Sequence, residues 1–424
     1  MENDPSHSGS MTPEGFGEYM KLRSCKKLYS KETQRAVSLD ETLLKAESRL
    51  PAAGITRVAD ITQLDRVGIP VFSCIRPTAK AGAITVYNGK GATPLAARVS
   101  AMMEGIERYS GEYQFTDPVI RTYREMGMEG LTLNPADLVL PLGSDPEAPL
   151  MWVEGHDLVS NQPILVPAHA VYHPLPKFVP PLFRTSTNGL ASGNTLEEAV
   201  FHALAEVIER DAWSLVETLK DAGPRIVLTD DTMVGEMANR FTSNGIDIQL
   251  RDITSDIGIP TIAAVADDVM LKDPALLTIG MGTHTNATIA AIRALSEVAQ
   301  SRLTQIHGAR EDTTVAEFRK KMGYERTKRI NRHWFEAKNS VEFNEIHSCD
   351  TPDFLDDITL ILRTLHARGI EQVIAVDLTR PEIDIPVVRV IVPGLEIYAI
   401  DPDRRGERCR HAQDHRFSRP ITPA

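Results

Sequence analysis

The chain has 424 residues, of which 42% are hydrophobic and 25% are charged. This composition is typical of a soluble globular protein of one or several subdomains and argues against wholesale disorder. The formal net charge of −12 disfavours general nucleic-acid binding, because such binding depends on neutralising phosphates. No apolar run reaches the length of a membrane span and the first residues lack the pattern of a secretion signal, so we expect a cytoplasmic protein that binds no membrane.

Positions 1–20 are polar and rich in Gly, Ser and Pro, and we expect them to form a disordered tail. Apolar spacing then predicts a helix over 42–50, and alternation predicts a strand over 84–87. The next residues, NGKG at 88–91, predict a tight turn. A long helix follows over 94–113, with proline near its first turn, where a missing N–H costs little.

A second turn-to-helix unit begins with TSTNGLASGNT at 185–195 and continues as a helix to about residue 219. Asn194 or Thr195 is the natural N-cap of this helix, and two glutamates occupy its positive first turn. Further helices are predicted over 287–307, 313–334 and 354–367, and strands over 164–166, 246–250, 261–266, 277–279, 373–378 and 387–392.

Strands and helices alternate along the chain, but several neighbouring strands lack a crossover helix between them. We therefore expect an α+β fold, with mixed β-sheets packed against long helices in closely joined subdomains over about 21–400. Residues 401–424 are expected to form a polar, solvated tail.

The cysteines do not form a disulfide framework, because they are few and none belongs to a C-x-x-C pair. They are Cys25, Cys74, Cys349 and Cys409. The pattern predicts reduced, partly buried thiols. A zinc site built from Cys409, His411 and His415 is the less favoured alternative, since the surrounding segment is highly charged.

Three long helices share a weak internal similarity that places acidic residues at related positions. The segments are SAMMEGIER at 100–108, ALAEVIER at 203–210 and ALSEVAQSR at 294–302. Because each helical residue advances about 100°, Ser100, Glu104 and Glu107 fall within about 60° of one another. A second stripe holds Glu198, His202, Glu206 and Glu209.

Two interpretations of these acidic stripes remain open from spacing alone. Such stripes are ordinarily solvated faces that carry Glu–Arg pairs. The remainder of both helices is strongly apolar, however, and each helix follows a glycine-bearing turn that could receive an anion. Carboxylates that converge from two helices would require cations, which favours Mg²⁺ with a nucleoside triphosphate.

Familiar nucleotide and hydrolase motifs are absent from the sequence. There is no G-x-x-x-x-G-K-[ST] loop, no dinucleotide-binding glycine fingerprint, no set of kinase motifs and no G-x-S-x-G. A nucleotide site in this chain must therefore be of another kind, and no protein nucleophile is assigned.

The combined motifs resemble those of the YcaO family. NGKGAT followed by SAMMEGIERYS, then NGLASGNTLEEAVFHALAEVIERD, then ALSEVAQSR match the family in order and spacing, over about 33–393. The segment GITRVADITQLDRVGIPVFSCIRPTA is similar to its N-terminal region. The chain is most similar to the TfuA-associated branch, which is credited with thioamidation of a glycine in methyl-coenzyme M reductase.

This resemblance implies an ATP-dependent enzyme that acts on a peptide-bond amide, and it assigns roles to particular residues. The implied Mg²⁺ ligands are Glu104, Glu107, Glu206 and Glu209. The implied ATP-contacting residues are Arg35, Thr42, Lys90, Ser100, Glu107, Asn194, Glu198, Arg210 and Arg302. Lys90 is either a phosphate ligand or structural, and Arg302 is expected to bind phosphate.

In the implied reaction, a sulfur nucleophile adds to the amide carbon, the oxyanion takes the γ-phosphoryl group of ATP, and phosphate leaves to give a thioamide. The resemblance also implies a protein substrate, namely the methyl-coenzyme M reductase α subunit, with a TfuA-like partner, an external sulfide source and a homodimer. The C-terminal SRPITPA lacks the Pro-x-Pro-x-Pro tail of peptide-cyclising members. Azoline or amidine formation, and a non-catalytic ATP-binding scaffold, are the alternatives.

Overall fold

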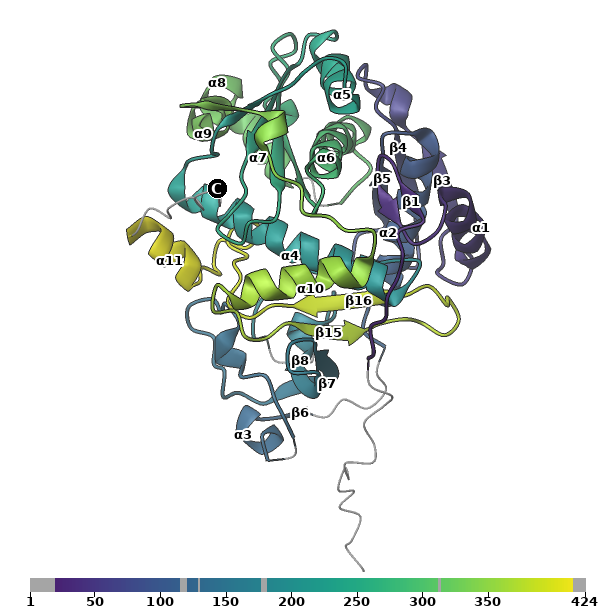
Figure 1. The fold of residues 1–424 in the computed structure, drawn as a ribbon, viewed down its shortest axis with the longest axis vertical. Coiled ribbons are helices and arrows are strands. Elements are labelled where there is room, and N and C mark those ends of the chain that lie inside the picture. Colours follow the sequence, from purple (N-terminus) through teal and green to yellow (C-terminus); the bar gives the residue numbers. More distant parts are fainter. Residues whose placement is uncertain (1–19, 115–119, 129, 177–180, 312–313, 415–424) are drawn as a thin grey trace, which may run out of the picture.

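The computed structural model describes residues 20–114, 120–128, 130–176, 181–311 and 314–414. The disordered tail expected over 1–20 lies outside these residues except for its last position. Helix α4 (Leu196–Leu219) runs through the middle of the molecule, between one sheet with its helices above it and another sheet below it (Figure 1). Thr195 is the N-cap of α4, and its side chain accepts a hydrogen bond from the backbone N–H of Glu198.

The N-terminal unit is a three-stranded antiparallel sheet covered by two helices. Its elements are α1 (Leu39–Arg49), β3 (Arg57–Asp60), β4 (Val71–Ile75), β5 (Val86–Lys90) and α2 (Pro94–Ser110). A short pair, β1 (Tyr29–Ser30) and β2 (Gln34–Arg35), precedes them. Helix α1 begins three residues before the predicted start, because Ser38 and Glu41 form a capping box.

The turn predicted at 88–91 is wrong, because its first three residues continue strand β5 and pair with β4. Gly89 is required there for a different reason. A Cβ at this position would lie 1.9 Å from the backbone nitrogen of Ala101 on α2, so the glycine allows the helix to approach the strand closely.

The upper body contains a five-stranded sheet in the order β13-β12-β11-β10-β14, antiparallel except for the parallel β10–β14 pair. The strands are β10 (Arg225–Val227), β11 (Asp247–Asp252), β12 (Thr261–Asp267), β13 (Thr278–Thr283) and β14 (Ser340–Glu342). The helices are α5 (Met233–Thr242), α6 (Ala287–His307), α7 (Thr314–Met322), α8 (Tyr324–Ile330) and α9 (Arg332–Phe335). The predicted helix over 287–307 is confirmed at both ends.

The lower body contains an antiparallel sheet in the order β6-β7-β15-β16-β9, with β8 paired to β7. The strands are β6 (Ile120–Arg121), β7 (Leu150–Asp157), β8 (Gln162–Pro167), β9 (Leu190–Ser192), β15 (Ile374–Asp377) and β16 (Val387–Ile391). The helices are α3 (Tyr123–Met126) and α10 (Phe354–His366). Together with the upper sheet, these elements confirm the expected α+β class with mixed sheets.

The described part of the predicted solvated tail, up to Asp414, packs on the rest of the molecule. Residues of α11 (Glu407–Asp414) pack on α4, and Cys409 is fully buried with its Sγ 3.6 Å from the carbonyl oxygen of Ser214. His411 is exposed beside Glu407, and His415 lies outside the described residues. The zinc alternative therefore gains no support, and all four cysteines are free thiols, as expected. Within the described ranges, no helix combines the length and apolarity needed to cross a bilayer.

Candidate functional site

A cavity of about 610 Å³ lies where α2, α4 and α6 converge with the segment around β2. Nearly all residues that the sequence singled out line it. They are Arg35, Thr42, Lys90, Ser100, Glu104, Glu107, Asn194, Glu198, Glu206, Glu209 and Arg210. The acidic stripes are therefore faces of an internal site and not solvated surface faces.

Helix α4 lines this cavity along much of its length. Glu198, His202, Glu206, Glu209 and Trp213 follow one another at intervals of three or four residues, so they share one helical face. At 1.5 Å per residue, Glu198 and Trp213 are about 22 Å apart along the axis. The cavity is thus long enough for an extended nucleotide.

At the N-terminal end of α4, Glu198 connects two distant segments of the chain. Its Oε2 accepts hydrogen bonds from the backbone N–H of Ala36 at 2.9 Å and from Nδ2 of Asn194 at 3.0 Å. Oγ1 of Thr42 donates to Oδ1 of Asn194 at 3.0 Å. The Arg35 guanidinium lies 3.6 Å from Glu198 Oε1. These contacts make a polar end wall with both donors and acceptors.

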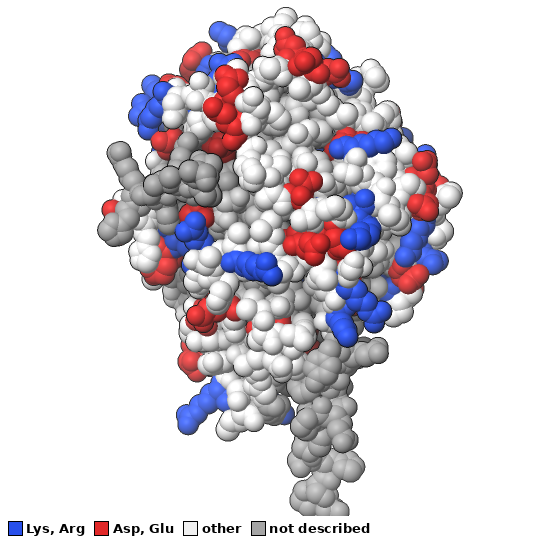
Figure 2. Space-filling model, in the orientation of Figure 1, with Lys and Arg blue, Asp and Glu red and all other residues white. Residues whose placement is uncertain are grey.

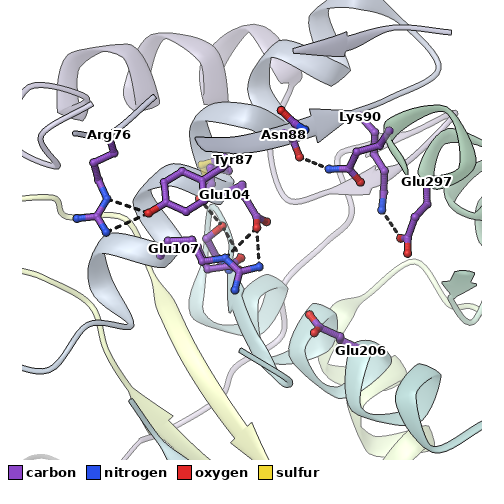
Figure 3. A network of polar contacts seen from close by, with 12 residues as sticks. Arg76, Tyr87, Asn88, Lys90, Glu104, Glu107, Glu206 and Glu297 are labelled. Carbon is purple, nitrogen blue, oxygen red and sulfur yellow. Dashed lines mark hydrogen bonds and ion pairs between the residues drawn. The ribbon is translucent and has the colours of Figure 1, made fainter. Parts of the chain in front are cut away.

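In the middle of the cavity, each acidic pair shares one arginine. Arg108 donates to Oε1 of Glu104 at 2.6 and 2.8 Å and lies 4.0 Å from Glu107. Arg210 lies 3.8 Å from Glu206 and 3.6 Å from Glu209. Figure 3 shows Glu104 and Glu107 on one side and Glu206 pointing from α4 toward the space between α2 and the Lys90–Glu297 pair. The two stripes therefore face a common space.

Backbone amides fix the second carboxylate of each pair. Glu107 Oε2 accepts from the N–H of Ser192 on β9 at 3.1 Å, and Glu209 Oε2 accepts from the N–H of Thr283 on β13 at 3.0 Å. Each helix is thereby tied to the end of a strand, and the orientation of its acidic residue is set before any ligand binds.

The acidic groups lie in surroundings that disfavour their charge. Burial, and next to it the charge of Glu104, raises the pKa of Glu107 well above its usual range. Burial also raises the pKa of Glu206 and of Glu209, although Arg210 opposes the shift in both. Additional positive charge in this space would relieve the penalty.

Helix α6 contributes residues that the sequence reasoning did not assign. Glu297 forms an ion pair with Lys90 across the cavity, and Arg293 and Gln300 also line it. Burial alone would raise the pKa of Glu297, but Lys90 and Arg210 outweigh it, so the pKa is lowered. The sequence contains one signal for Glu297, because in the third copy of the internal similarity it occupies the position that Glu104 and Glu206 occupy in the other two.

Arg302 is not a cavity residue, which corrects the prediction that it binds phosphate. It is fully buried, with ion pairs to Asp65 at 2.7 Å and to Asp268 at 3.1 Å. These two carboxylates already hold the guanidinium. Arg293, nine residues earlier on α6, faces the cavity, and its buried Nε has no partner among the described residues.

The acidic residues fit Mg²⁺ as partial ligands. In the described part of the chain, no three His, Cys, Asp or Glu side chains are spaced as a ready-made metal cage. Mg²⁺ commonly binds one or two carboxylates and completes its octahedral shell with water and substrate phosphates. Paired glutamates from α2 and α4, facing a cavity with room for a triphosphate, suit this mode.

Comparisons with known proteins agree with this site. A protein-family model described as YcaO cyclodehydratase, ATP- and Mg²⁺-binding, matches residues 88–396. An uncharacterized protein of Methanothermobacter thermautotrophicus is 50% identical over 383 residues, which cover 89% of this chain and 98% of that protein. A protein described as uncharacterized in the tfuA 3′ region of Rhizobium leguminosarum bv. trifolii is 34% identical, over 86% of this chain and 89% of its own length.

Solved structures give the same fold. YcaO from Methanopyrus kandleri bound with AMPPCP and Mg²⁺ matches with a TM-score of 0.77 and 32% identity, over 90% of this chain and 98% of that one. A heterocyclase in complex with substrate and cofactor matches in fold with a TM-score of 0.77 at 23% identity, over 89% of this chain and 54% of that one. The cofactors of the matched family are ATP and Mg²⁺. The chain belongs to the YcaO family.

Proposed function

We propose that this protein is a Mg-ATP-dependent enzyme that exchanges the oxygen of a backbone amide for sulfur and so makes a thioamide. The observation that carries the ATP-dependent part is the meeting of acidic pairs from α2 and α4 in one cavity, each pair fixed by a strand N–H. The thioamide part is supported by the relative in a tfuA region and by the likeness to YcaO from a methanogen.

Within this proposal the cavity residues divide into three groups, for the nucleoside, the phosphates and Mg²⁺. Arg35, Thr42, Asn194 and Glu198 would hold the nucleoside end. Arg210, Lys90 and Ser100 would face the phosphates, and Arg293 would take the phosphate role first expected of Arg302. Glu104, Glu107, Glu206 and Glu209 would hold Mg²⁺, which neutralises negative charge on the triphosphate when bound.

The substrate amide supplies the oxygen and the acceptor carbon, and the protein supplies orientation and charge. Sulfide adds to the amide carbon, and the oxyanion so formed attacks the γ-phosphorus of ATP. Guanidinium groups of Arg210 and Arg293 would offer forked donors to the phosphoryl oxygens as charge develops on them. Phosphate then leaves with the former amide oxygen. We propose a glycine of the methyl-coenzyme M reductase α subunit as the target, with a TfuA-like partner assisting sulfur delivery.

A second candidate is azoline formation by cyclodehydration, which the description of the matched family favours. It uses the same phosphorylation of an amide oxygen, but the nucleophile is a Cys, Ser or Thr side chain of the peptide. The two reactions differ in the mass of the product, because one exchanges oxygen for sulfur and the other loses water.

The test is to incubate the protein with ATP, Mg²⁺, sulfide and the target peptide, with and without the TfuA-like partner, and to read the peptide mass. We expect sulfur-for-oxygen exchange at glycine in the wild type and none in Glu104→Ala or Glu206→Ala. The exposed Glu236→Ala on α5 is the matched control and should retain activity. Loss of water would establish cyclodehydration instead, and full activity of Glu206→Ala would remove it from the metal site.

A further inference from the structure

A second cavity, of about 60 Å³, has a different character from the first. Its wall combines apolar side chains, among them Leu138, Phe183 and Ile397, with polar groups, including two arginines, Arg389 and Arg404. A cavity of about 10–15 Å³ in this measure holds one water molecule. The space therefore suits a small ion together with a few water molecules and is too small for a nucleotide.

Both arginines are buried, and within the described residues no carboxylate lies in ion-pair contact with either, although the charges of Glu206 and Glu107 act on Arg389 from further away. Arg389 is 4% exposed and Arg404 is 6% exposed. Each donates its Nε–H to a backbone carbonyl, of Ala170 at 2.8 Å and of Val139 at 2.5 Å. In the described ranges neither forms an ion pair, and Nη1 of Arg389 has no hydrogen-bond partner. Burial lowers the pKa of both groups to about 10.

This arrangement is unusual within the molecule. Other deeply buried arginines, such as Arg76 and Arg302, are neutralised by carboxylates. Arg251 has none, but its guanidinium donates to three backbone carbonyls. Two neighbouring buried cations without a carboxylate in direct contact are costly, because desolvation disfavours each and they repel one another, and the more distant charges of Glu206 and Asp401 compensate only in part. A bound anion would remove both penalties.

The small cavity shares a wall with the main one. Val207, which lines it, directly follows Glu206 on α4. Thr187 lines the main cavity, while its neighbours Ser186 and Asn188 line the small one. Arg389 also pairs in register with Leu190, a main-cavity residue, across β16 and β9. Arg389 therefore lies between the two cavities, within range of the charge of Glu206.

The lining selects the kind of anion. Guanidinium is weakly hydrated and polarisable, and the Arg404 guanidinium lies 3.8 Å from the centre of the Phe183 ring. A singly charged sulfur anion loses less hydration than a dianion when it enters a partly apolar space. A strongly hydrated dianion such as phosphate would lose its water shell here without enough donors to replace it.

We propose that this cavity, which we call the arginine pocket, binds the hydrosulfide ion that supplies sulfur to the amide. The inference rests on the proposed function. The hydrosulfide sulfur forms the new C–S bond, the amide C–O bond breaks after its oxygen accepts the γ-phosphoryl group, and the hydrosulfide proton leaves with phosphate. Amide, HS⁻ and ATP thus give thioamide, ADP and HPO₄²⁻, with no oxidant or reductant.

The experiment compares Arg389→Met and Arg389→Lys with the wild type and with Arg184→Met, an exposed arginine that lines neither cavity. With ATP and peptide saturating, both Arg389 variants should raise the KM for sulfide at least about tenfold, as loss of a charge-assisted hydrogen bond predicts. Their KM for ATP should stay near the wild-type value. Arg184→Met should match the wild type in both constants.

A binding measurement separates this inference from the proposed function. Without ATP and peptide, sodium hydrosulfide should raise the melting temperature of the wild type more than sodium chloride does at equal ionic strength, and Arg389→Met should abolish the difference. Equal effects of the two salts, or an unchanged sulfide KM in both Arg389 variants, would overturn the arginine pocket. If sulfide stabilises the wild type specifically but the wild type makes no thioamide, the proposed function is refuted and the arginine pocket is not.

Discussion

Glu206 shows how the position of a single carboxylate can lower the stability of the ligand-free protein. Its carboxylate is partly buried near Glu104, and Arg210, at 3.8 Å, compensates only in part. The folded-state pKa of Glu206 is raised above the value in an unfolded chain, so the native protein binds this proton more tightly. Stability therefore falls as the pH rises from the unfolded-state pKa through the folded-state pKa.

We predict that Glu206→Gln raises the melting temperature of the ligand-free protein by about 1–3 °C at pH 8, because glutamine carries no charge to desolvate. The gain should shrink toward about pH 4, where the glutamate is protonated in both states. Calorimetry between pH 4.5 and 8 measures it, with Glu236→Gln as the exposed control. A gain that is independent of pH would contradict the electrostatic explanation.

Substitutions of two arginines of α6 should affect different properties, the stability of the protein at Arg302 and its binding of nucleotide at Arg293. Arg302→Met leaves Asp65 and Asp268 buried without their partner and should cost about 3–5 kcal/mol of unfolding free energy. Arg293→Met should leave stability nearly unchanged and weaken ATP binding at least about tenfold. Denaturant unfolding and isothermal calorimetry give the two quantities. If Arg302→Met instead weakened ATP binding and Arg293→Met instead lowered stability, Arg302 would belong to the nucleotide site.

At the scale of elements, glycines let long helices lie against the strands that precede them. A Cβ at Gly89 would meet the backbone of α2 at 1.9 Å, and one at Gly280 would meet the carbonyl oxygen of Ala294 on α6 at 2.3 Å. Both helices are thus held close to their strands, which brings Lys90 of β5 within ion-pair reach of Glu297.

Gly89→Ala should therefore destabilise the protein by about 1–3 kcal/mol or more, since the clash is with backbone atoms that cannot rotate away. Gly127→Ala is the matched control, because its Cβ would meet no atom closer than 3.4 Å and its φ is −63°. Chemical denaturation distinguishes them. Equal stability of the two variants would show that α2 can move away from β5 at little cost.

The sequence predicts the long helices well, but it does not predict that strand β5 includes the NGK residues or that the C-terminal segment forms helix α11. The apolar period defines α6, which Asn286 caps at its N-terminus and Gly308, in a left-handed conformation, ends at its C-terminus. The NGKG segment contains typical turn residues, but its glycines serve helix–strand contact, which is a tertiary effect. Helix α11 is hard to foresee, because its buried side is only Cys409 and Ala412, while the remainder of the helix is charged.

At the scale of the whole molecule, the three internal copies meet around one cavity. Spacing predicts that Glu104 and Glu107, or Glu206 and Glu209, share a face, but only the fold shows that the two faces converge and that α6 adds Glu297 and Arg293. The error over Arg302 has the same origin, since helical position alone does not show whether a side chain faces the cavity or a buried acidic pair.

Figure 2 shows acidic and basic side chains interspersed over the described part of the visible face, with no continuous basic patch.

The most direct test of the central claim follows the amide oxygen. A target peptide labelled with ¹⁸O at the glycine carbonyl is incubated with the protein, ATP, Mg²⁺ and sulfide, and the released phosphate is analysed by mass spectrometry. If the cavity transfers the γ-phosphoryl group to the amide oxygen, each thioamide formed should be matched by one ¹⁸O atom in phosphate. Unlabelled phosphate, with the ¹⁸O retained in the peptide, would contradict the account.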